Sequence, residues 1–380
     1  MTALCEALGR PQDRFESAHV VGTNGKTSVT RMAAAILADE GRPTGWLTSP
    51  HFSGWAERLG TGGPDVAPPD FERAVETVAD VCAEVGESLP DAGHPTQFEV
   101  SVAAGFLALA DAGVETAVIE AGLGGRLDAT NVIDSKVTAL VSVGMDHAEW
   151  LGDDELSIAT EKLAVLTPGS VLVTGPLAPE VDALAAGTAE ALDCDLVRVS
   201  APPEGGYPAL NLAVAIQVAN VLLGSPVEPS AAELARELVI PGRLELVSTD
   251  PPVIFDVAHN RPGARALAEA LPAVAANRPV VGCFGVASDK DATGILEELG
   301  RGMASLVVTA PEAPAGSPPG RGPADPESLA EAALVLGIPV EISPEPARAL
   351  ELAREKARDV EGLVLLFGSH SLFGALDRDT

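Results

Sequence analysis

Short runs of apolar, often β-branched residues alternate with longer segments of helical periodicity along almost the whole chain. This alternation constrains the fold strongly, because parallel strands must be joined by crossover connections and amphipathic helices are the usual ones. In the first part of the chain the predicted strands are 17–22, 117–121, 137–143, 171–174 and 196–199. The predicted helices between them are 28–40, 71–85 and 100–111. We therefore expect an α/β fold with a large doubly wound sheet.

A second series of strands and helices follows the segment Ile240-Pro241-Gly242-Arg243. Its predicted strands are 253–257, 280–284, 305–309 and 363–367, and its helices include 263–276 and 292–303. The Pro- and Gly-rich segment 311–326 lies inside this series, where it predicts a surface loop rather than a domain boundary. We predict two domains, 1–245 and 246–380, of which the second is a smaller Rossmann-like α/β unit.

Composition narrows the classes of partner. The chain has 380 residues, and its net charge of −31 opposes binding to nucleic acid and to anionic membranes. The one long uncharged stretch, 205–227, contains Pro208, Asn211, Gln217 and Asn220. We predict that it is a buried helix, too short and too polar to span a membrane. The 4 cysteines form no CxxC pair, which argues against a disulfide framework and against a structural zinc site. No secretory signal opens the chain, and we expect a cytoplasmic protein.

The strongest local motif is a glycine-rich loop between a strand and an amphipathic helix. It consists of Gly22, Thr23, Asn24, Gly25, Lys26, Thr27 and Ser28. Successive backbone N–H groups, the start of the helix and the Lys26 ammonium would together cradle a polyphosphate anion. Val20 stands where the full GxxxxGK[ST] motif has its first glycine, so the alternative is a glycine-rich turn with an incidental lysine. Because the loop lies between strand and helix, we interpret it as an ATP-binding P-loop-type site.

A carboxylate and a run of glycines end the second long strand. Glu120 is the last polar group of that strand, and the glycines begin at Gly122. Open α/β sheets bind ligands at their carboxyl edge, which makes Glu120 a candidate magnesium ligand. Leu127 stands where a dinucleotide-binding fingerprint would have its third glycine, so that interpretation is weak. Asp128 and Asn131 can equally be ordinary turn caps.

A histidine follows the next strand, in the pair Asp146-His147. Taken alone, a histidine at a strand end is more often structural than a ligand. The carboxyl ends of neighbouring parallel strands meet at one edge, however, so His147 is predicted to lie beside Glu120 as a second candidate ligand. Lys162 lies on the helix that follows, and its alternative interpretation is a solvated surface charge.

Together these motifs resemble those of folylpolyglutamate synthases and dihydrofolate synthases, which are members of the Mur ligase superfamily. The shared segments keep the order and approximate spacing of the family over nearly the entire chain: 22–28, Ser49-Pro50-His51, Glu57-Arg58, Phe98-Glu99, 118–133, 146–152, Lys162, Pro241-Gly242-Arg243 and 256–260. The segments 118–133 and 256–260 are the more specific ones, since all Mur-type amide ligases share the phosphate loop.

The resemblance implies an ATP-dependent ligase that joins L-glutamate to a folate, or to dihydropteroate, through an acyl phosphate. Such an enzyme acts in folate biosynthesis and one-carbon metabolism, and we expect a cytoplasmic monomer. Two alternatives stay open: a Mur-type ligase that acts on a non-folate carboxylate, and a P-loop ATPase without ligase activity.

The resemblance also assigns roles residue by residue. It implies nucleotide contacts from the phosphate loop and from Asn211, Arg243, Asp256 and His259. It implies magnesium held by Ser49, Glu120 and His147, and a carbamylated Lys162. The pterin substrate would face Thr96, Gln97, Phe98, Glu99, Leu127, Asp128 and Ala129. The residues expected to act in catalysis are Lys26, Lys162, His147 and Arg243.

The chemistry of such a reaction fits these residue types. Phosphoryl transfer between anions needs charge neutralisation, which Mg²⁺, Lys26 and Arg243 would supply, with Arg58 and Arg126 as further candidates. An acyl phosphate must be kept from water, and closure of the second domain is the expected device. The sequence departs from the family at several places. Thr27 replaces a common glycine, and Val21 and Val102 replace a small residue and a threonine. The region 368–370 matches loosely, and the chain starts about twenty residues before the phosphate loop, where relatives carry a further segment that contributes to pterin binding.

Overall fold

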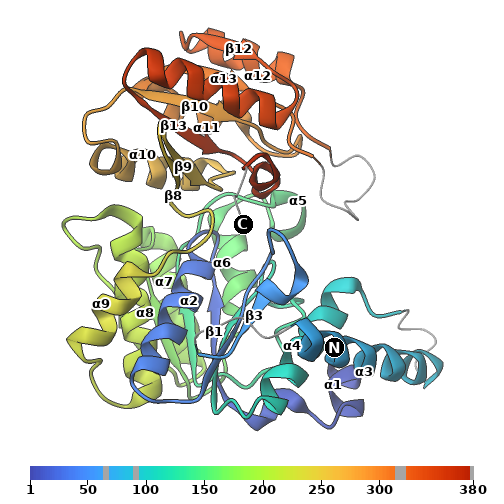
Figure 1. Cartoon of the computed structure of the whole chain (residues 1–380). Coiled ribbons are helices and arrows are strands. Elements are labelled where there is room, and N and C mark those ends of the chain that lie inside the picture. Colours follow the sequence, from blue (N-terminus) through green and yellow to red (C-terminus); the bar gives the residue numbers. More distant parts are fainter. Residues whose placement is uncertain (63–67, 89–93, 313–321, 377–380) are drawn as a thin grey trace. The chain divides into compact units, whose positions relative to one another are not determined.

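The chain forms two compact units in the computed structural model, which describes residues 1–62, 68–88, 94–312 and 322–376 (Figure 1). The first unit comprises Met1–Glu204 and Pro208–Leu238, and the second comprises Gly205–Tyr207 and Val239–Thr380. The turn before residue 245 belongs to the second unit, where Leu244 N donates to the Asp256 carboxylate at 2.9 Å. The division therefore falls earlier in the chain than the predicted boundary after residue 245.

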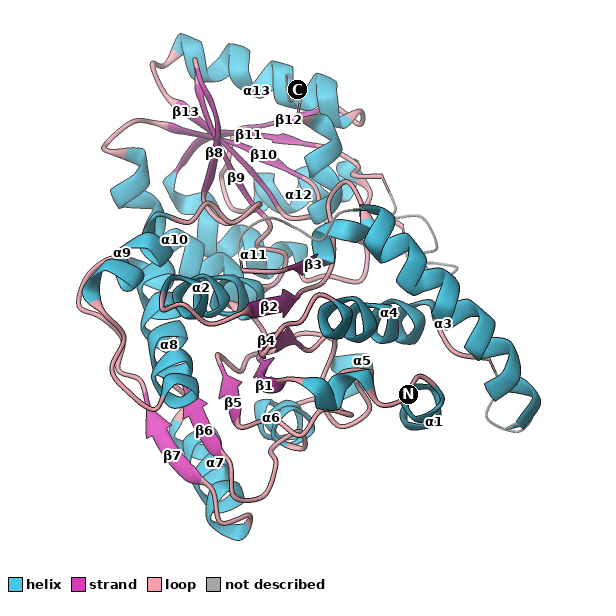
Figure 2. Cartoon of the chain, turned by 60° about the horizontal axis from the view of Figure 1, so that its bottom comes forward, coloured by secondary structure: helices cyan, strands magenta, loops and turns pink. Residues whose placement is uncertain are grey.

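A seven-stranded sheet forms the centre of the first unit, in the order β3-β2-β4-β1-β5-β6-β7 (Figure 2). Neighbouring strands are parallel except β2 and β3. The strands are β1 Glu16–Val21, β2 Thr44–Leu47, β3 Leu59–Gly60, β4 Thr116–Glu120, β5 Val137–Leu140, β6 Val171–Thr174 and β7 Asp195–Arg198. The strand order reverses beside β1, and the carboxyl ends of β1, β4 and β5 border the place where sheets of this kind bind ligands.

Helices cover both faces of this sheet, and α2 and α4 lie on opposite faces of its central strands (Figure 2). The helices are α1 Thr2–Ala7, α2 Lys26–Asp39, α3 Pro68–Ser88, α4 Gln97–Asp111, α5 Ala148–Leu151, α6 Glu155–Leu163, α7 Pro179–Ala191, α8 Gly206–Leu223 and α9 Pro229–Glu237. Two 3₁₀ helices span Pro11–Arg14 and Trp55–Arg58. Helix α2 buries Val29, Ala33, Ile36 and Leu37, a spacing of three and four residues that gives it one apolar face.

The predicted α/β fold is confirmed, and each strand predicted for the first unit is present. The largest difference concerns the predicted strand 137–143, which ends at Leu140. Beyond that point the Ser142 backbone and side chain bond to the phosphate loop instead of a neighbouring strand. Strands β2 and β3 were not predicted: β3 has only 2 residues, and the 4 residues of β2 include Gly45, a residue type that strands disfavour.

The second unit is built on a six-stranded sheet in the order β12-β11-β10-β13-β9-β8. Its pairs are parallel except β8 and β9. The strands are β8 Glu245–Thr249, β9 Pro252–Asp256, β10 Val280–Phe284, β11 Met303–Val308, β12 Val340–Ile342 and β13 Leu363–Phe367. The helices are α10 Arg261–Ala275, α11 Ala292–Leu299, α12 Pro326–Val335 and α13 Pro346–Asp359, with 3₁₀ helices at Gly300–Gly302 and His370–Ala375.

Helices α10, α11 and α12 cover one face of this second sheet and α13 covers the other (Figure 2). Leu267, Ile295 and Leu329 from the three helices pack with Leu306 and Leu365 of the sheet. The predicted helix 292–303 ends early, because the glycine-containing 3₁₀ helix at Gly300–Gly302 follows α11. Most of the predicted loop 311–326 lies outside the described residues.

Helix α8 occupies the long uncharged stretch. By length and composition alone it could cross a membrane, which corrects the prediction that the stretch is too short and too polar. Only 39% of its 18-residue window is buried, so it is also less buried than predicted. One helix of this kind among the described residues is weak evidence for a membrane span, because core helices of soluble proteins have the same dimensions.

Candidate active site

Three chain segments meet at the carboxyl edge of the first sheet. The phosphate loop follows β1, Glu120 ends β4, and residues 141–147 follow β5. Since β1 lies between β4 and β5, the sheet order itself brings these segments together. The phosphate loop and Glu120 are therefore neighbours at the edge where Glu120 was predicted.

Ser142 holds the phosphate loop in place. Its backbone O accepts a hydrogen bond from Thr23 N at 2.9 Å, and its Oγ accepts one from Asn24 N at 2.9 Å. Thr23 Oγ1 donates to Gly144 O at 3.0 Å. The N–H groups of Thr23 and Asn24 thus bond within the protein. The donors for an anion shift to the start of α2, where the first N–H groups of a helix have no intrahelical acceptor.

Gly25 is the N-cap of α2 and adopts a left-handed conformation, with φ at 84°. A Cβ at this position would lie 2.6 Å from Asn211 Oδ1 and 2.7 Å from Val141 Cγ1. Glycine is therefore required by the close approach as well as by the backbone. The same contact shows that Asn211, which is 4% exposed on α8, lies against the phosphate loop.

Two lysines share one carbonyl at this site. Lys26 Nζ and Lys162 Nζ each donate to Gly22 O at 3.0 Å. Lys162 is 3% exposed, so the alternative that it is a solvated surface charge is wrong. Burial, together with the nearby Lys26, lowers the pKa of Lys162 from 10.5 to about 7, although Asp146 and Asp128 act in the opposite direction. A large neutral fraction near pH 7 makes this amine a nucleophile as well as a cation.

Glu120 links the phosphate loop to the loop that follows β2. Its Oε1 accepts from Thr27 Oγ1 at 3.0 Å, and its Oε2 accepts from Ser49 N at 3.2 Å. Oxygen donors of this type suit Mg²⁺, which is usually bound by one or two carboxylates and substrate phosphates. Among the described residues, no three His, Cys, Asp or Glu side chains are grouped so that they could hold a metal ion. The residues present fit a Mg²⁺ site completed by phosphate oxygens.

His147 begins α5 with φ at 52°, a left-handed conformation that is strained for a residue other than glycine. Its N–H donates to Asp146 Oδ1 at 3.0 Å, and its Nε2 lies 3.8 Å from Asp146 Oδ2. Strain of this kind gathers at functional sites. The residue lies on the same loop as Ser142, close in sequence to the phosphate-loop contacts.

The loop between β2 and β3 is organised by Glu57. Burial acts to raise the pKa of Glu57, but hydrogen bonds from Ser53, Phe52 and Gly54 outweigh it and lower that pKa. Beside this loop, Arg58 Nε donates to His51 Nδ1 at 3.0 Å, and the guanidinium lies 4.3 Å over the centre of the Trp55 ring. The loop that contains Ser49 is therefore tied at several points.

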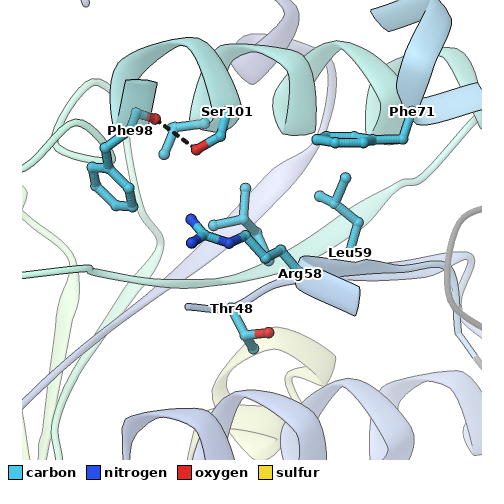
Figure 3. Close-up of a pocket in the computed structure, with 8 residues that line it drawn as sticks. Thr48, Arg58, Leu59, Phe71, Phe98 and Ser101 are labelled. Carbon is cyan, nitrogen blue, oxygen red and sulfur yellow. Dashed lines mark hydrogen bonds between the residues drawn. The ribbon is translucent and has the colours of Figure 1, made fainter. Parts of the chain in front are cut away.

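A small pocket opens beside Arg58, whose guanidinium points toward Phe98 (Figure 3). The other residues labelled there are Thr48, Leu59, Phe71 and Ser101. The pocket has a volume of about 10 Å³, which holds about one water molecule, so it is not a substrate site in this conformation. Burial lowers the pKa of Arg58 and the Glu120 carboxylate acts to raise it, which places Arg58 within the electrostatic reach of Glu120.

The predicted substrate segment 96–99 forms the start of α4. Thr96 and Glu99 make a reciprocal capping box: Glu99 N donates to Thr96 Oγ1 at 3.2 Å, and Thr96 N donates to Glu99 Oε2 at 2.8 Å. Gln97 is the first residue of the helix. Phe98 packs against the glycine loop, since a Cβ on Gly122 would lie 2.4 Å from its ring. This segment thus has a structural role whether or not it contacts a substrate.

Asp128 caps the loop that begins at Gly122. Its Oδ2 accepts from Leu123 N at 2.8 Å and its Oδ1 accepts from Thr130 N at 2.9 Å. Leu127 is 84% exposed and Ala129 is 5% exposed, with Asp128 half-buried between them. The turn-capping alternative therefore describes Asp128 correctly, and its partial exposure leaves it accessible to a ligand.

The remaining predicted nucleotide residues lie in the second unit: Arg243 precedes β8, Asp256 ends β9, and His259 follows it. Asp256 is 4% exposed and accepts from Leu244 N at 2.9 Å and from Tyr207 Oη at 2.5 Å. Burial raises the pKa of both Asp256 and Tyr207, and Arg243 acts against this in each case. His259 Nδ1 lies 2.9 Å from Val257 O. The Arg243 guanidinium is thus close enough to Asp256 to stabilise its charged carboxylate.

Sequence reasoning missed Ser142 and Tyr207. Ser142 lies in the predicted strand 137–143, where a polar residue among apolar ones was the available signal. Tyr207 is the only tyrosine of the chain and lies in the uncharged stretch, which gave no sign of its partner Asp256.

The chain matches two Mur ligase families. Residues 20–168 match the Mur ligase middle domain, and residues 242–370 match the Mur ligase glutamate ligase domain. The chain is 33% identical over 355 residues to a dihydrofolate synthase/folylpolyglutamate synthase of Mycobacterium tuberculosis, which covers 81% of this chain and 73% of the relative. It is 30% identical over 301 residues to the Escherichia coli protein of the same name, which covers 73% of this chain and 68% of the relative.

Solved structures agree with these matches. Mycobacterium tuberculosis folylpolyglutamate synthase complexed with ADP and AMPPCP superposes with a TM-score of 0.91 at 31% identity, over 100% of this chain and 95% of that one. Escherichia coli FolC in complex with DHPP and ADP gives a TM-score of 0.85 at 25% identity, over 99% and 91%. The resemblance read from the motifs is confirmed. The chain belongs to the dihydrofolate synthase/folylpolyglutamate synthase family of ATP-dependent Mur-type ligases.

Proposed function

We propose that this chain adds L-glutamate to a folate, or to dihydropteroate, at the expense of ATP and through an acyl phosphate. The observation that carries the proposal is the meeting of Lys26, Lys162 and Glu120 at one edge of the first sheet, through the contacts of Gly22, Thr27 and Ser49. The named relatives share this activity class, and two similar structures hold ADP, one of them with DHPP.

The phosphates of ATP would lie at the start of α2. Backbone N–H groups at a helix start attract anions, and Lys26 would add a full positive charge. Asn211 packs against Gly25 from α8, which supports its role near the nucleotide. Arg243, Asp256 and His259 are proposed as nucleotide contacts on the strength of the resemblance.

Glu120, Ser49 and Thr27, with His147 from the following loop, would hold Mg²⁺. The bound ion would neutralise negative charge on the phosphates. The donor types of Glu120, Ser49 and Thr27 support this assignment, because Mg²⁺ prefers oxygen ligands. His147 offers a nitrogen and is included on the strength of the resemblance. A chain with a net charge of −31 that binds anionic substrates needs such local positive charge.

Lys162 is suited to carbamylation. A neutral amine adds to CO₂ to give a carbamate and release one proton, and the pKa of Lys162 near 7 supplies the neutral amine. The carbamate nitrogen keeps one hydrogen, so the bond to Gly22 O can persist. The product is an anion beside Lys26, where a cation previously stood.

The reaction would run in two steps. A carboxylate oxygen of the substrate forms a bond to the γ-phosphorus as the bond to ADP breaks, and Lys26 stabilises the transferred charge. The glutamate amine then attacks the acyl carbon, phosphate leaves, and the amine loses a proton. Phe98, which packs against Gly122, and Asp128, which lies in the same loop, would contact the pterin end of the acid.

Cytoplasmic location and a monomeric state complete the proposal. The four cysteines Cys5, Cys82, Cys194 and Cys283 are free thiols, which supports a reducing compartment.

The proposal is tested by incubating the protein with ATP, Mg²⁺ and L-glutamate together with one acid at a time: dihydropteroate, a reduced folate or a UDP-muramoyl peptide. Phosphate release and glutamylated product with a pteroyl acid are the expected results. If only the incubation with the muramoyl peptide yields product, the protein is a non-folate Mur-type ligase. If phosphate is released when no acid is added, the protein is a simple ATPase.

Lys26→Ala serves as the matched inactive variant. We expect it to lose at least about a hundredfold in phosphate release, because it removes the cation nearest the transferred charge. Lys136→Ala is the control, since Lys136 is half-exposed and pairs with Glu16 at 3.5 Å. Equal activity of the two variants would contradict the phosphate-loop assignment.

A further inference from the structure

A histidine is buried at the centre of the first sheet, on the strand that leads into the phosphate loop. His19 lies in β1, paired with Ile119 of β4 and Thr138 of β5, and it is 0% exposed. Its Nε2 lies 2.8 Å from Thr130 Oγ1. Its Nδ1 is buried without a hydrogen-bond partner. The other residues of the strand around it, Ala18 and Val20, are apolar and equally buried.

The hydrogen bonds around Thr130 have only one consistent direction. Thr130 Oγ1 lies 2.5 Å from Asp128 Oδ1, and an ionised carboxylate can only accept. The Thr130 hydroxyl therefore donates its single proton to Asp128. Its contact with His19 must then be a bond that it accepts, from Nε2–H. This assigns the Nε2–H tautomer to His19.

An apolar side chain would fill the same space without leaving Nδ1 unpaired, so packing alone does not explain the histidine. Burial lowers the pKa of His19 to about 4, with the Asp128 carboxylate acting against it. The ring is therefore neutral at physiological pH and keeps one donor and one unused acceptor. The Nε2–H donor binds Thr130 Oγ1, whereas the Nδ1 acceptor has no partner.

The chain of bonds ends on a residue of the glycine loop. Asp128 Oδ1 accepts from Thr130 N and Oγ1, and Oδ2 accepts from Leu123 N at 2.8 Å. His19 thus acts through Thr130 on the orientation of a half-buried carboxylate, on the loop against which Phe98 packs. Without the His19 donor, the Thr130 hydroxyl keeps its bond to Asp128 but loses one of the two contacts that fix its orientation.

We infer that His19 is a positioning residue of the ligase: through Thr130 it holds the Asp128 carboxylate as an acceptor for N–H donors of the acid substrate. The inference rests on the proposed function in one respect, namely that Asp128 contacts the pteroyl acid. It does not require contact between His19 and any substrate. It predicts that loss of His19 changes the KM for the pteroyl acid and leaves the KM for ATP unchanged.

Two pairs of variants test the inference. His19→Leu and Thr130→Val each remove one link, whereas His19→Gln keeps an N–H donor near Nε2 and Thr130→Ser keeps the hydroxyl. We expect the first pair to raise KM for the pteroyl acid about tenfold, with KM for ATP and kcat changed less than about twofold. The second pair should stay within about threefold of the parent.

A double-mutant cycle identifies the path. In an Asp128→Asn background, His19→Leu should raise KM no further, because the two residues act in series. Independent, multiplying effects would overturn the inference. Equal losses in His19→Gln and His19→Leu, or a parallel rise in both KM values, would also overturn it and leave His19 as a packing residue.

Nitrogen-15 NMR of the histidine rings gives a readout that needs no activity. The His19 signals, assigned by comparison with His19→Gln, should show the Nε2–H tautomer in the substrate-free protein. An Nδ1–H tautomer would overturn the inference even if the ligase activity is confirmed. If the expected tautomer is found but no pteroyl acid stimulates ADP formation, the proposed function fails and the hydrogen-bond chain stands. Should His19→Leu not fold, Thr130→Val and the NMR measurement still decide the question.

Discussion

At the scale of single residues, the buried ammonium of Lys162 lowers the stability of the folded chain when it is charged. Its ammonium is 3% exposed and shares the Gly22 carbonyl with Lys26. Below about pH 7 the lysine is charged in both the folded and the unfolded chain, and the folded chain bears the full cost of burying that charge. Between about pH 7 and pH 10.5 only the unfolded chain holds the proton, so this contribution to the free energy of unfolding improves as pH rises.

Lys162→Met should therefore change the pH dependence of stability. Relative to this variant, the parent protein should gain about 1 kcal/mol in free energy of unfolding for each pH unit above about pH 7.5. Urea unfolding in CO₂-free buffer at a series of pH values measures the difference. Lys136→Met is the control, because Lys136 is half-exposed and pairs with Glu16 at the surface. A constant difference between parent and Lys162→Met would show that Lys162 is not titrating in this range.

The site residues that could be predicted from sequence lie next to element boundaries. Lys26 follows a strand and glycines, and Glu120 ends an apolar strand, so the local pattern marks both. The Ser142 bond to Asn24 spans 118 positions and the His19 contact with Thr130 spans 111. No local periodicity encodes such pairs, because the strand order of the sheet creates them.

At the scale of a single element, variants at the start of α4 can show whether this segment only caps the helix or also binds the substrate. Thr96→Ala removes the N-cap acceptor of Glu99 N and should destabilise the first unit by about 1 kcal/mol. Glu99→Gln keeps an acceptor for Thr96 N and should cost less. Urea denaturation of the two variants measures both effects.

Kinetics of the same two variants decide whether this segment also binds the pterin. If it is only a cap, KM for the pteroyl acid stays within about twofold of the parent in both variants. A large rise in that KM for Glu99→Gln, with stability unchanged, would mean that the carboxylate contacts the substrate.

Short apolar runs were predicted as strands even at 4 residues, as in β6, whereas the 13-residue helix α7 was not predicted. The predicted strand 363–367 matches β13, whose five residues form one uninterrupted apolar run. Strand β12 has 3 residues and pairs only with β11 among the described residues, so its sequence carries little signal of its own. Such strands form because a neighbouring strand offers an edge to pair with.

At the scale of the whole molecule, two compact units predict two thermal transitions in calorimetry. A nucleotide at about one hundred times its Kd adds about 2.7 kcal/mol to the stability of whatever binds it. We expect the transition of the first unit to rise when ATP and Mg²⁺ are added, because the first unit carries the phosphate loop and Glu120. Lys26→Ala should lose this rise.

The second transition tests the roles assigned to Arg243 and Asp256. If these residues bind the nucleotide, as the resemblance implies, the second transition should rise as well. A rise confined to the first transition would limit the nucleotide site to the first unit. No change in either would contradict ATP binding altogether.

The buried hydroxyl of Tyr207 has a practical consequence. The chain contains 1 tyrosine, and its pKa lies well above 10 because of burial and the Asp256 carboxylate. Phenolate absorbance in alkaline solution therefore comes from one chromophore at one known place. Ionisation of Tyr207, followed by its absorbance, therefore reports that its hydrogen bond to Asp256 in the second unit has broken.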